Sequence, residues 1–204
     1  MSVKQTGRGG RRRVAWFAFD NLRPAYSNGL KPAKAKGLSM PPTTNPHHPP
    51  PPADGSLRRF FHERETNAPR QAIWSAWTDV STWKHWDEGL ADALVDVPFA
   101  LGVRGMIIPN AGLRSPFEIT EFTDGASYTI STRLIAAELH VKRTFVDGSE
   151  SCRYRHDVWF SGPLAFAWAG LLGPGFRRSL PTTMAKLADF AEAQATTTSE
   201  EKQS

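Results

Sequence analysis

The sequence predicts an α+β domain in which a curved antiparallel sheet of about seven strands surrounds a long C-terminal helix. Three observations support this fold class. Short strand candidates recur about every ten residues between 90 and 160. Two short tryptophan-rich helical segments precede them within residues 67–88, and an apolar and amphipathic segment follows them. Because the sheet must bury one face, the economical arrangement places that face against the final helix.

The strand candidates are separated by Gly, Pro, Asn or Asp, which punctuate short strands. Asp124-Gly125 and Asp147-Gly148 are good hairpin turns, and no helical pattern separates the later candidates, so we expect an antiparallel meander. Gly102 and Gly105 are interpreted as turn or strand glycines. The expected strands are 57–65, 90–97, 103–109, 117–122, 128–135, 138–146 and 152–160.

Period-two alternation assigns faces in the last three strands. Their mainly apolar faces, represented by Tyr128 and Phe145, should point inward. Arg143 and His156 share these inward faces although they are polar, whereas Trp159 falls on the outward face. These three residues break the simple pattern, so they are candidates for a role beyond packing.

The first helix is expected to begin just after residue 66. Ile73, Trp74 and Trp77 form one helical stripe, and Thr66 or Asn67 is a suitable cap. The two tryptophans are interpreted as core residues.

The second helix carries Trp83 and Trp86 at a spacing of three residues. Asp79 either ends the first helix or caps the second. Asp79 and Asp87 are both interpreted as helix-capping residues in the first place and as acidic functional groups only in the second. Trp83 and Trp86 are equally suited to the core and to the mouth of a pocket.

The C-terminal segment is expected to be helical but interrupted. Residues 164–172 are almost wholly apolar, Gly173-Pro174-Gly175 should break the helix, and residues 176–190 form one amphipathic stripe. Pro181 should kink this helix or mark its true start. Residues 196–204 form a polar tail that we expect to fray.

Residues 1–55 are expected to be a disordered basic tail that cannot form a sheet. They hold nine of the sixteen prolines and nine Lys and Arg against two Asp and Glu, a net charge of +7. Three hypotheses remain: an arm attracted to RNA or membranes, a proline-rich ligand, and a solvated extension, which we favour. Translation from Met40 is a variant of the last. His47-His48 is weak as a metal site, and no metal or cofactor is expected.

The composition limits the setting of the protein. Cys152 is the only cysteine, which is compatible with a reducing cytoplasm, and it is interpreted as a small packed residue. No apolar run approaches the roughly 20 residues of a membrane span. The apolar segment after Arg11-Arg12-Arg13 is shorter than the roughly 7–15 residues of a secretion signal, so export is not expected.

The element order, the stretch AIWSAWTDVSTWKHWDEG, the sequence SGPL after the last strand and GPGFRRSLPTTMAKLADFAE at the end resemble one known family. They are similar to polyketide cyclase/dehydrase-like members of the START/Bet v 1-like (SRPBCC) superfamily, over residues 56–195. The resemblance implies a helix-grip fold with a hydrophobic cavity between sheet and helix. It also implies lipids, polyketides or other apolar ligands, with cyclase or hydrolase activity in some members. Relatives often carry His where Arg143 stands, and no catalytic set transfers.

The site hypothesis follows from the inward faces and this implied cavity. His156 is a weak candidate for a general base, and Arg143 could hold an acidic ligand group or pair with a carboxylate such as Glu118 or Glu121. The expected ligand-lining residues are Trp83, Trp86, Phe117, Tyr128, Ile130, Val141, Arg143, Tyr154, His156, Val158, Phe166, Trp168, Phe176 and Met184.

Three functions therefore remain open. The first is binding of a small hydrophobic molecule without catalysis, and the second is a cofactor-free cyclase or dehydratase that uses an acid or base such as His156. The third is an interaction protein whose tail contacts RNA or anionic surfaces, which is the only route to nucleic acid. The sequence does not specify the oligomeric state.

Overall fold

The computed structural model describes residues 43–44, 48–146 and 152–201. It confirms the predicted class: an antiparallel, curved sheet with a long C-terminal helix and short helices after the first long strand. The elements are β1 (Thr43–Thr44), β2 (Arg59–Thr66), α1 (Arg70–Thr78), the 3-10 turn η1 (Val80–Thr82), α2 (Trp83–Trp86), β3 (Leu90–Leu94), β4 (Arg104–Pro109), β5 (Ser115–Thr123), β6 (Ser127–Leu134), β7 (Ala137–Phe145), β8 (Cys152–Ser161) and α3 (Ala165–Glu201).

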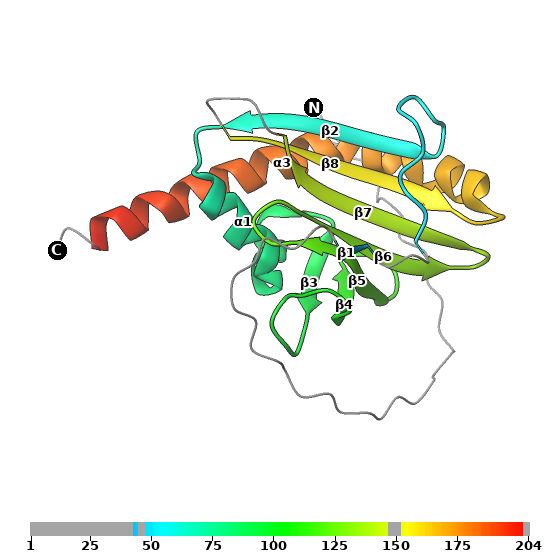
Figure 1. The fold of residues 1–204 in the computed structure, drawn as a ribbon, viewed down its shortest axis with the longest axis horizontal. Helices are drawn as coiled ribbons and strands as arrows, with labels where there is room; N and C mark the ends of the chain where they lie inside the picture. The colour runs from blue at the N-terminus through cyan, green and yellow to red at the C-terminus, as the bar shows by residue number, and fades with distance from the viewer. Residues whose placement is uncertain (1–42, 45–47, 147–151, 202–204) are drawn as a thin grey trace, which may run out of the picture.

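The main sheet has the order β2-β8-β7-β6-β5-β4-β3, so β3 to β8 form the predicted meander. The first long strand, β2, lies at one edge of the sheet and pairs with the last strand, β8, from Arg59 opposite Trp159 to Thr66 opposite Cys152. Figure 1 shows α3 running along β2 and β8, with its red C-terminal end extending beyond the sheet. The turn at Asp124-Gly125 is confirmed, with Gly125 at φ 66°, whereas Asp147-Gly148 lies outside the described residues.

Helix α3 is continuous, so the predicted break at Gly173-Pro174-Gly175 is wrong. Pro174 and Pro181 both lie inside the helix, and the polar segment expected to fray is helical as far as Glu201. Proline removes one backbone hydrogen bond, but the helix packs against the sheet on both sides of each proline, which offsets this loss. Phe176 and Leu180 belong to one buried cluster, and later residues of α3 belong to another.

The predicted cap of α1 is also wrong. The N-cap position is Pro69, and it makes no side-chain capping bond. Thr66 is used elsewhere: its hydroxyl donates to Glu192 Oε1 at 2.7 Å and accepts from the Ala68 amide. The expectation that Asp79 caps the next helical segment is confirmed, because its side chain accepts from the Ser81 amide.

The end of the N-terminal segment packs against the outer face of the sheet, the face opposite α3. Strand β1 pairs with β5, which corrects the expectation that residues 1–55 cannot form a sheet. Arg59 donates to the Pro52 carbonyl at 2.6 Å and pairs with Asp54 at 2.6 Å. Proline lacks a backbone donor but keeps its carbonyl, which explains this contact. Expectations for residues 1–42 lie outside the described part of the chain.

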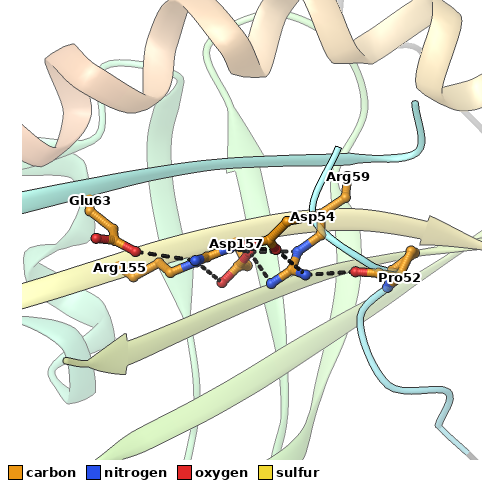
Figure 2. Close-up of polar contacts among 6 residues, drawn as sticks. All are labelled: Pro52, Asp54, Arg59, Glu63, Arg155 and Asp157. Atoms are coloured by element: carbon orange, nitrogen blue, oxygen red, sulfur yellow. Dashed lines mark hydrogen bonds and ion pairs between the residues drawn. The ribbon is translucent and has the colours of Figure 1, made fainter. Parts of the chain in front are cut away.

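A chain of alternating charges holds this segment in place (Figure 2). Arg59 and Arg155 both bond the carboxylate of Asp157, at 2.8 Å each. Arg155 also reaches Asp54 at 3.1 Å and Glu63 at 3.1 Å. Asp157 is nearly buried, so these partners offset the cost of removing its charge from water. The charges join β2, β8 and the segment before β2.

Gly173 lies on the face of α3 that packs closely against the Phe60 ring of β2. A Cβ atom added there would lie 2.7 Å from Cε1 of the Phe60 ring, whereas one added at Gly170 would meet no heavy atom within 4 Å. We expect Gly173→Ala to destabilise the fold by about 1–3 kcal/mol through overpacking. Gly170→Ala should instead stabilise it by up to about 1 kcal/mol through helix propensity. Urea unfolding followed by circular dichroism measures both, and equal stabilities would contradict the close contact.

Candidate functional site

Most of the predicted lining residues belong to one of two buried clusters of apolar side chains from the sheet and the helices. One buried cluster unites Trp83 and Trp86 from α2 with inward residues of the sheet and Met184 of α3. A second contains Val158 and Phe176, with Trp168 at its edge. Phe166 does not join either cluster: it is 63% exposed on α3, with the Arg58 guanidinium 4.8 Å above its ring. The remaining predicted members of the first cluster are Phe117, Tyr128, Ile130 and Tyr154, and Val141 packs against both clusters.

Trp77 lies at the centre of the first cluster and is fully buried. Its ring is 4.7 Å from that of Phe145 and 5.8 Å from that of Tyr154. Its backbone carbonyl, near the C-terminal end of α1, accepts hydrogen bonds from Trp83 Nε1 and the Tyr128 hydroxyl, each at 3.0 Å. The last carbonyls of a helix lack partners within the helix, so these two side chains satisfy one of them. The prediction that Trp77 is a core residue is confirmed.

Trp83 and Trp86 are likewise core residues rather than residues of a pocket mouth, since each is at most 1% exposed. The guanidinium carbon of Arg143, the predicted inward charge, lies 4.7 Å from each of the two rings, whose own centroids are 6.4 Å apart. Cation–π attraction of this kind is stronger where water is excluded. The short helix α2 therefore supplies the environment of the buried arginine.

Arg143 is 4% exposed. Its Nη1 donates to the Tyr128 hydroxyl, which in turn donates to the Trp77 carbonyl. Burial raises the pKa of Tyr128 to about 12, so the phenol keeps its proton. Nε of Arg143 has no hydrogen-bond partner among the described residues.

The carboxylate near Arg143 is Asp87, not the predicted Glu118 or Glu121. Burial raises the pKa of Asp87, and the amide of Gly89 and the positive charge of Arg143 oppose that rise. Glu118 instead pairs with Arg104 at 3.0 Å, and Glu121 pairs with Lys142 at 2.8 Å. The inward charge therefore has an acidic neighbour from the protein itself.

His156, the weak catalytic candidate, lies directly opposite Arg143 in the β7–β8 register and is 2% exposed. Its ring lies 5.6 Å from Trp77 and 5.9 Å from Tyr154. Burial lowers the pKa of His156 well below its usual value, and the nearby Arg143 lowers it further. The imidazole is therefore neutral near pH 7 and packs among aromatic rings.

A hollow of about 360 Å³ lies beside α1, at one end of the sheet. Trp74, Phe99 and Phe122 supply its aromatic walls, and Asp79 and Asp124 supply carboxylates. Phe99 comes from the loop between β3 and β4. Its ring lies 4.8 Å from that of Tyr128, so the wall of the hollow packs directly on the partner of Arg143.

Sequence reasoning did not assign this hollow. Phe99 lies in a loop, where no periodicity predicts the direction of a side chain. Trp74 belongs to the buried core, as predicted, and also lines the hollow. One signal in the sequence was available: Phe99 follows Pro98 in the connection between two expected strands. An aromatic ring in a surface loop is expected to pack against another part of the protein or against a ligand. The remaining lining residues are Ser75 and Thr78.

Comparison with known proteins supports the fold. No protein-family profile matches the chain, and no curated protein sequence matches it. Solved structures do match. Protein NE0264 from Nitrosomonas europaea has 15% identity and a TM-score of 0.55, covering 69% of this chain and 98% of its own.

Two further structures have a described biological context. Norcoclaurine synthase from Thalictrum flavum, a point mutant in complex with a transition-state analogue, has 12% identity and a TM-score of 0.52, covering 68% of this chain and 96% of its own. DynU16, a protein of the dynemicin biosynthetic locus, has 17% identity and a TM-score of 0.52, covering 66% of this chain and 47% of its own. At these identities the comparisons establish a shared helix-grip fold alone.

Within the described part of the chain, no helix combines the length and apolar character needed to cross a bilayer.

The neutral state of His156 predicts a pH-dependent stability. Because the folded-state pKa lies below the unfolded value of about 6.5, the contribution of His156 is present above pH 6.5 and is lost as the pH falls below it. Burial also lowers the pKa of His140, to about 4, so the contribution of His140 to folding stability is likewise lost as the pH falls below 6.5. We expect His156→Asn to reduce the slope of unfolding free energy against pH, between pH 6 and pH 5, by up to about 1.4 kcal/mol per pH unit.

Urea unfolding at several pH values measures this slope. His85→Asn is the control, because it makes the same substitution at an exposed histidine of α2. A wild-type slope in His156→Asn would contradict a neutral buried imidazole at this position.

Proposed function

We propose that this Bet v 1-like fold binds a small, mainly aromatic molecule in the hollow beside α1, without covalent chemistry. The observation that supports the proposal is the set of three aromatic side chains, Trp74, Phe99 and Phe122, that line an open surface hollow of about 360 Å³. This volume falls within the range of about 300–1,000 Å³ that is typical of small-molecule sites. Aromatic walls favour planar apolar ligands through stacking and through the burial of apolar surface.

The loop that carries Phe99 lies between this site and the buried Tyr128–Arg143 pair. Phe99 separates the hollow from Tyr128, and its loop between Val95 and Val103 contains no strand or helix. Loops rearrange more readily than the elements that they connect. Displacement of Phe99 would bring a ligand oxygen close to the Tyr128–Arg143 pair, where the free Nε of Arg143 offers a donor. In this proposal Arg143 contacts the ligand through Nε once Phe99 has moved.

The charges of the site favour a neutral, oxygen-containing ligand. Asp79 and Asp124 line the hollow and repel anions, whereas Arg143 beneath it favours a hydrogen-bond acceptor. A phenol or an aromatic ketone satisfies both conditions, because it brings no charge to the rim and presents oxygen to the interior. Polyketide-like aromatic compounds belong to this chemical class.

Binding is favoured over the cyclase alternative because His156 does not line the hollow. Its ring lies deeper, against Trp77 and Tyr154, whereas a general base must reach the proton that it removes. The hypothesis of an RNA-binding tail depends on residues outside the described ranges. A reducing, cytoplasmic setting is part of the proposal, because Cys152 is the only cysteine.

Phe122→Ala tests the proposed site. Calorimetric titration with 2-naphthol and with naringenin should give saturable binding to the wild-type protein. Loss of the Phe122 ring removes an aromatic wall, so binding should weaken by about 10–100-fold, which corresponds to about 1.5–3 kcal/mol for one buried aromatic contact.

Phe166→Ala is the matched control, because it removes the same side chain from an exposed position on α3 outside the hollow. This variant should bind within about twofold of the wild-type protein, a change of less than roughly 0.5 kcal/mol. Equal weakening by both substitutions, or no saturable binding of either compound by the wild-type protein, would overturn the proposal. Circular dichroism verifies that each variant is folded.

A further inference from the structure

A second constellation of chemistry-bearing side chains lies on the outer face of the sheet, away from the hollow. His48, Glu138 and His140 place one potential ligand atom each within 4.8 Å of one another. We call these residues the outer histidine site. Glu138 and His140 belong to β7, and His48 belongs to the segment before β2, so the site joins two distant parts of the chain.

His140 is held in a fixed orientation. Its Nδ1 lies 2.7 Å from Ser131 Oγ, and its Nε2 lies 2.8 Å from Ser161 Oγ. Its ring stacks on that of Trp159 at 4.9 Å. A metal-binding histidine commonly donates its second ring N–H to an oxygen, which orients the ring, and Ser131 is in position to accept from Nδ1. His140 is fully buried, and a neutral imidazole is the form that binds metals.

The distances are close to those of a metal site. Nε2 of His140 lies 3.8 Å from Glu138 Oε2, and Nδ1 of His48 lies 3.6 Å from the same oxygen. Bonds of about 2.0–2.2 Å to a tetrahedral zinc ion place ligand atoms about 3.4 Å apart. Two of the three pairs therefore need only a few tenths of an ångström of closure. The two imidazoles have ligand atoms within 4.8 Å of each other, and the partly exposed side chains of His48 and Glu138 have room to close the remaining distance.

The strongest pointer to a ligand is an unsatisfied atom. Nδ1 of His48 is buried and has no hydrogen-bond partner among the described residues, since its distance to Glu138 exceeds hydrogen-bond length. A buried polar atom without a partner is unfavourable. A metal ion between His48, Glu138 and His140 would satisfy this nitrogen and would replace the Ser161 hydroxyl at Nε2 of His140.

We propose that His48, Glu138 and His140 bind a divalent zinc-class metal ion, with water as the fourth ligand. Two imidazoles and one carboxylate suit zinc, and one open position is compatible with three protein ligands. Bound metal would fasten the proline-rich segment that begins at His48 to the middle of the sheet. The ion pairs of Arg59 and Arg155 also hold this segment on the sheet (Figure 2). With a metal site present, the strength of its attachment would depend on the concentration of the metal ion.

The test uses the full-length protein, freed of metal by a chelator and then dialysed. Calorimetric titration with zinc should show one ion per chain, and cobalt should give the visible absorption bands of a tetrahedral site. Zinc should also raise the thermal unfolding temperature. His48→Ala and Glu138→Gln should each weaken zinc binding at least tenfold and abolish the rise in unfolding temperature. Both substitutions are at partly exposed side chains, so the fold should persist.

Two control variants separate this site from adventitious histidine binding. His85→Asn removes an exposed histidine elsewhere on the surface and should leave zinc binding unchanged. His47→Ala removes the neighbouring histidine in the sequence and should also leave it unchanged. Absence of stoichiometric binding to the wild-type protein would overturn the proposal. So would unaltered binding in His48→Ala, or loss of binding in His47→Ala alone.

Discussion

The guanidinium of Arg143 is the buried charge on which the arrangement of the interior depends. Removing such a charge from water costs several kcal/mol unless the protein replaces its solvation. Two indole faces from α2, the Tyr128 hydroxyl from β6 and the negative potential of Asp87 provide that replacement. These groups come from separate segments, so a single side chain of β7 interacts with α2, with β6 and with the residue that follows α2. The tryptophan-rich stretch thus contacts a cation as well as filling apolar space.

Much of the fold could be predicted because alternation and spacing are local properties of the sequence. They identified seven strands, the inward direction of Arg143 and His156 and the outward direction of Trp159. They could not show that Trp159 is 2% exposed, because the segment near its outer face lies about a hundred residues earlier. They also failed at Pro174, where packing against the sheet on both sides of the proline outweighs one missing hydrogen bond.

The candidate site was harder to predict for a related reason. The period-two alternation of the strands identifies the residues that face the helix. Those residues are the buried side chains of the interior. A hollow at the end of a sheet is instead formed where loops meet helices, and loop residues such as Phe99 have no period from which to infer a direction. The predicted residues and the observed hollow nevertheless meet at Tyr128, which contacts Phe99 on one side and Arg143 on the other.

The pairing of β2 with β8 has a consequence for how the protein is made. Arg59 lies opposite Trp159, so the first long strand has no partner until about a hundred further residues have left the ribosome. At roughly 5–20 residues per second, that interval is about 5–20 s. During this time β2 presents an unpaired edge with Phe60 and Phe61, a form of strand that invites association with other chains. Newly synthesised molecules are therefore vulnerable to aggregation through this edge during the whole interval between the synthesis of β2 and that of β8.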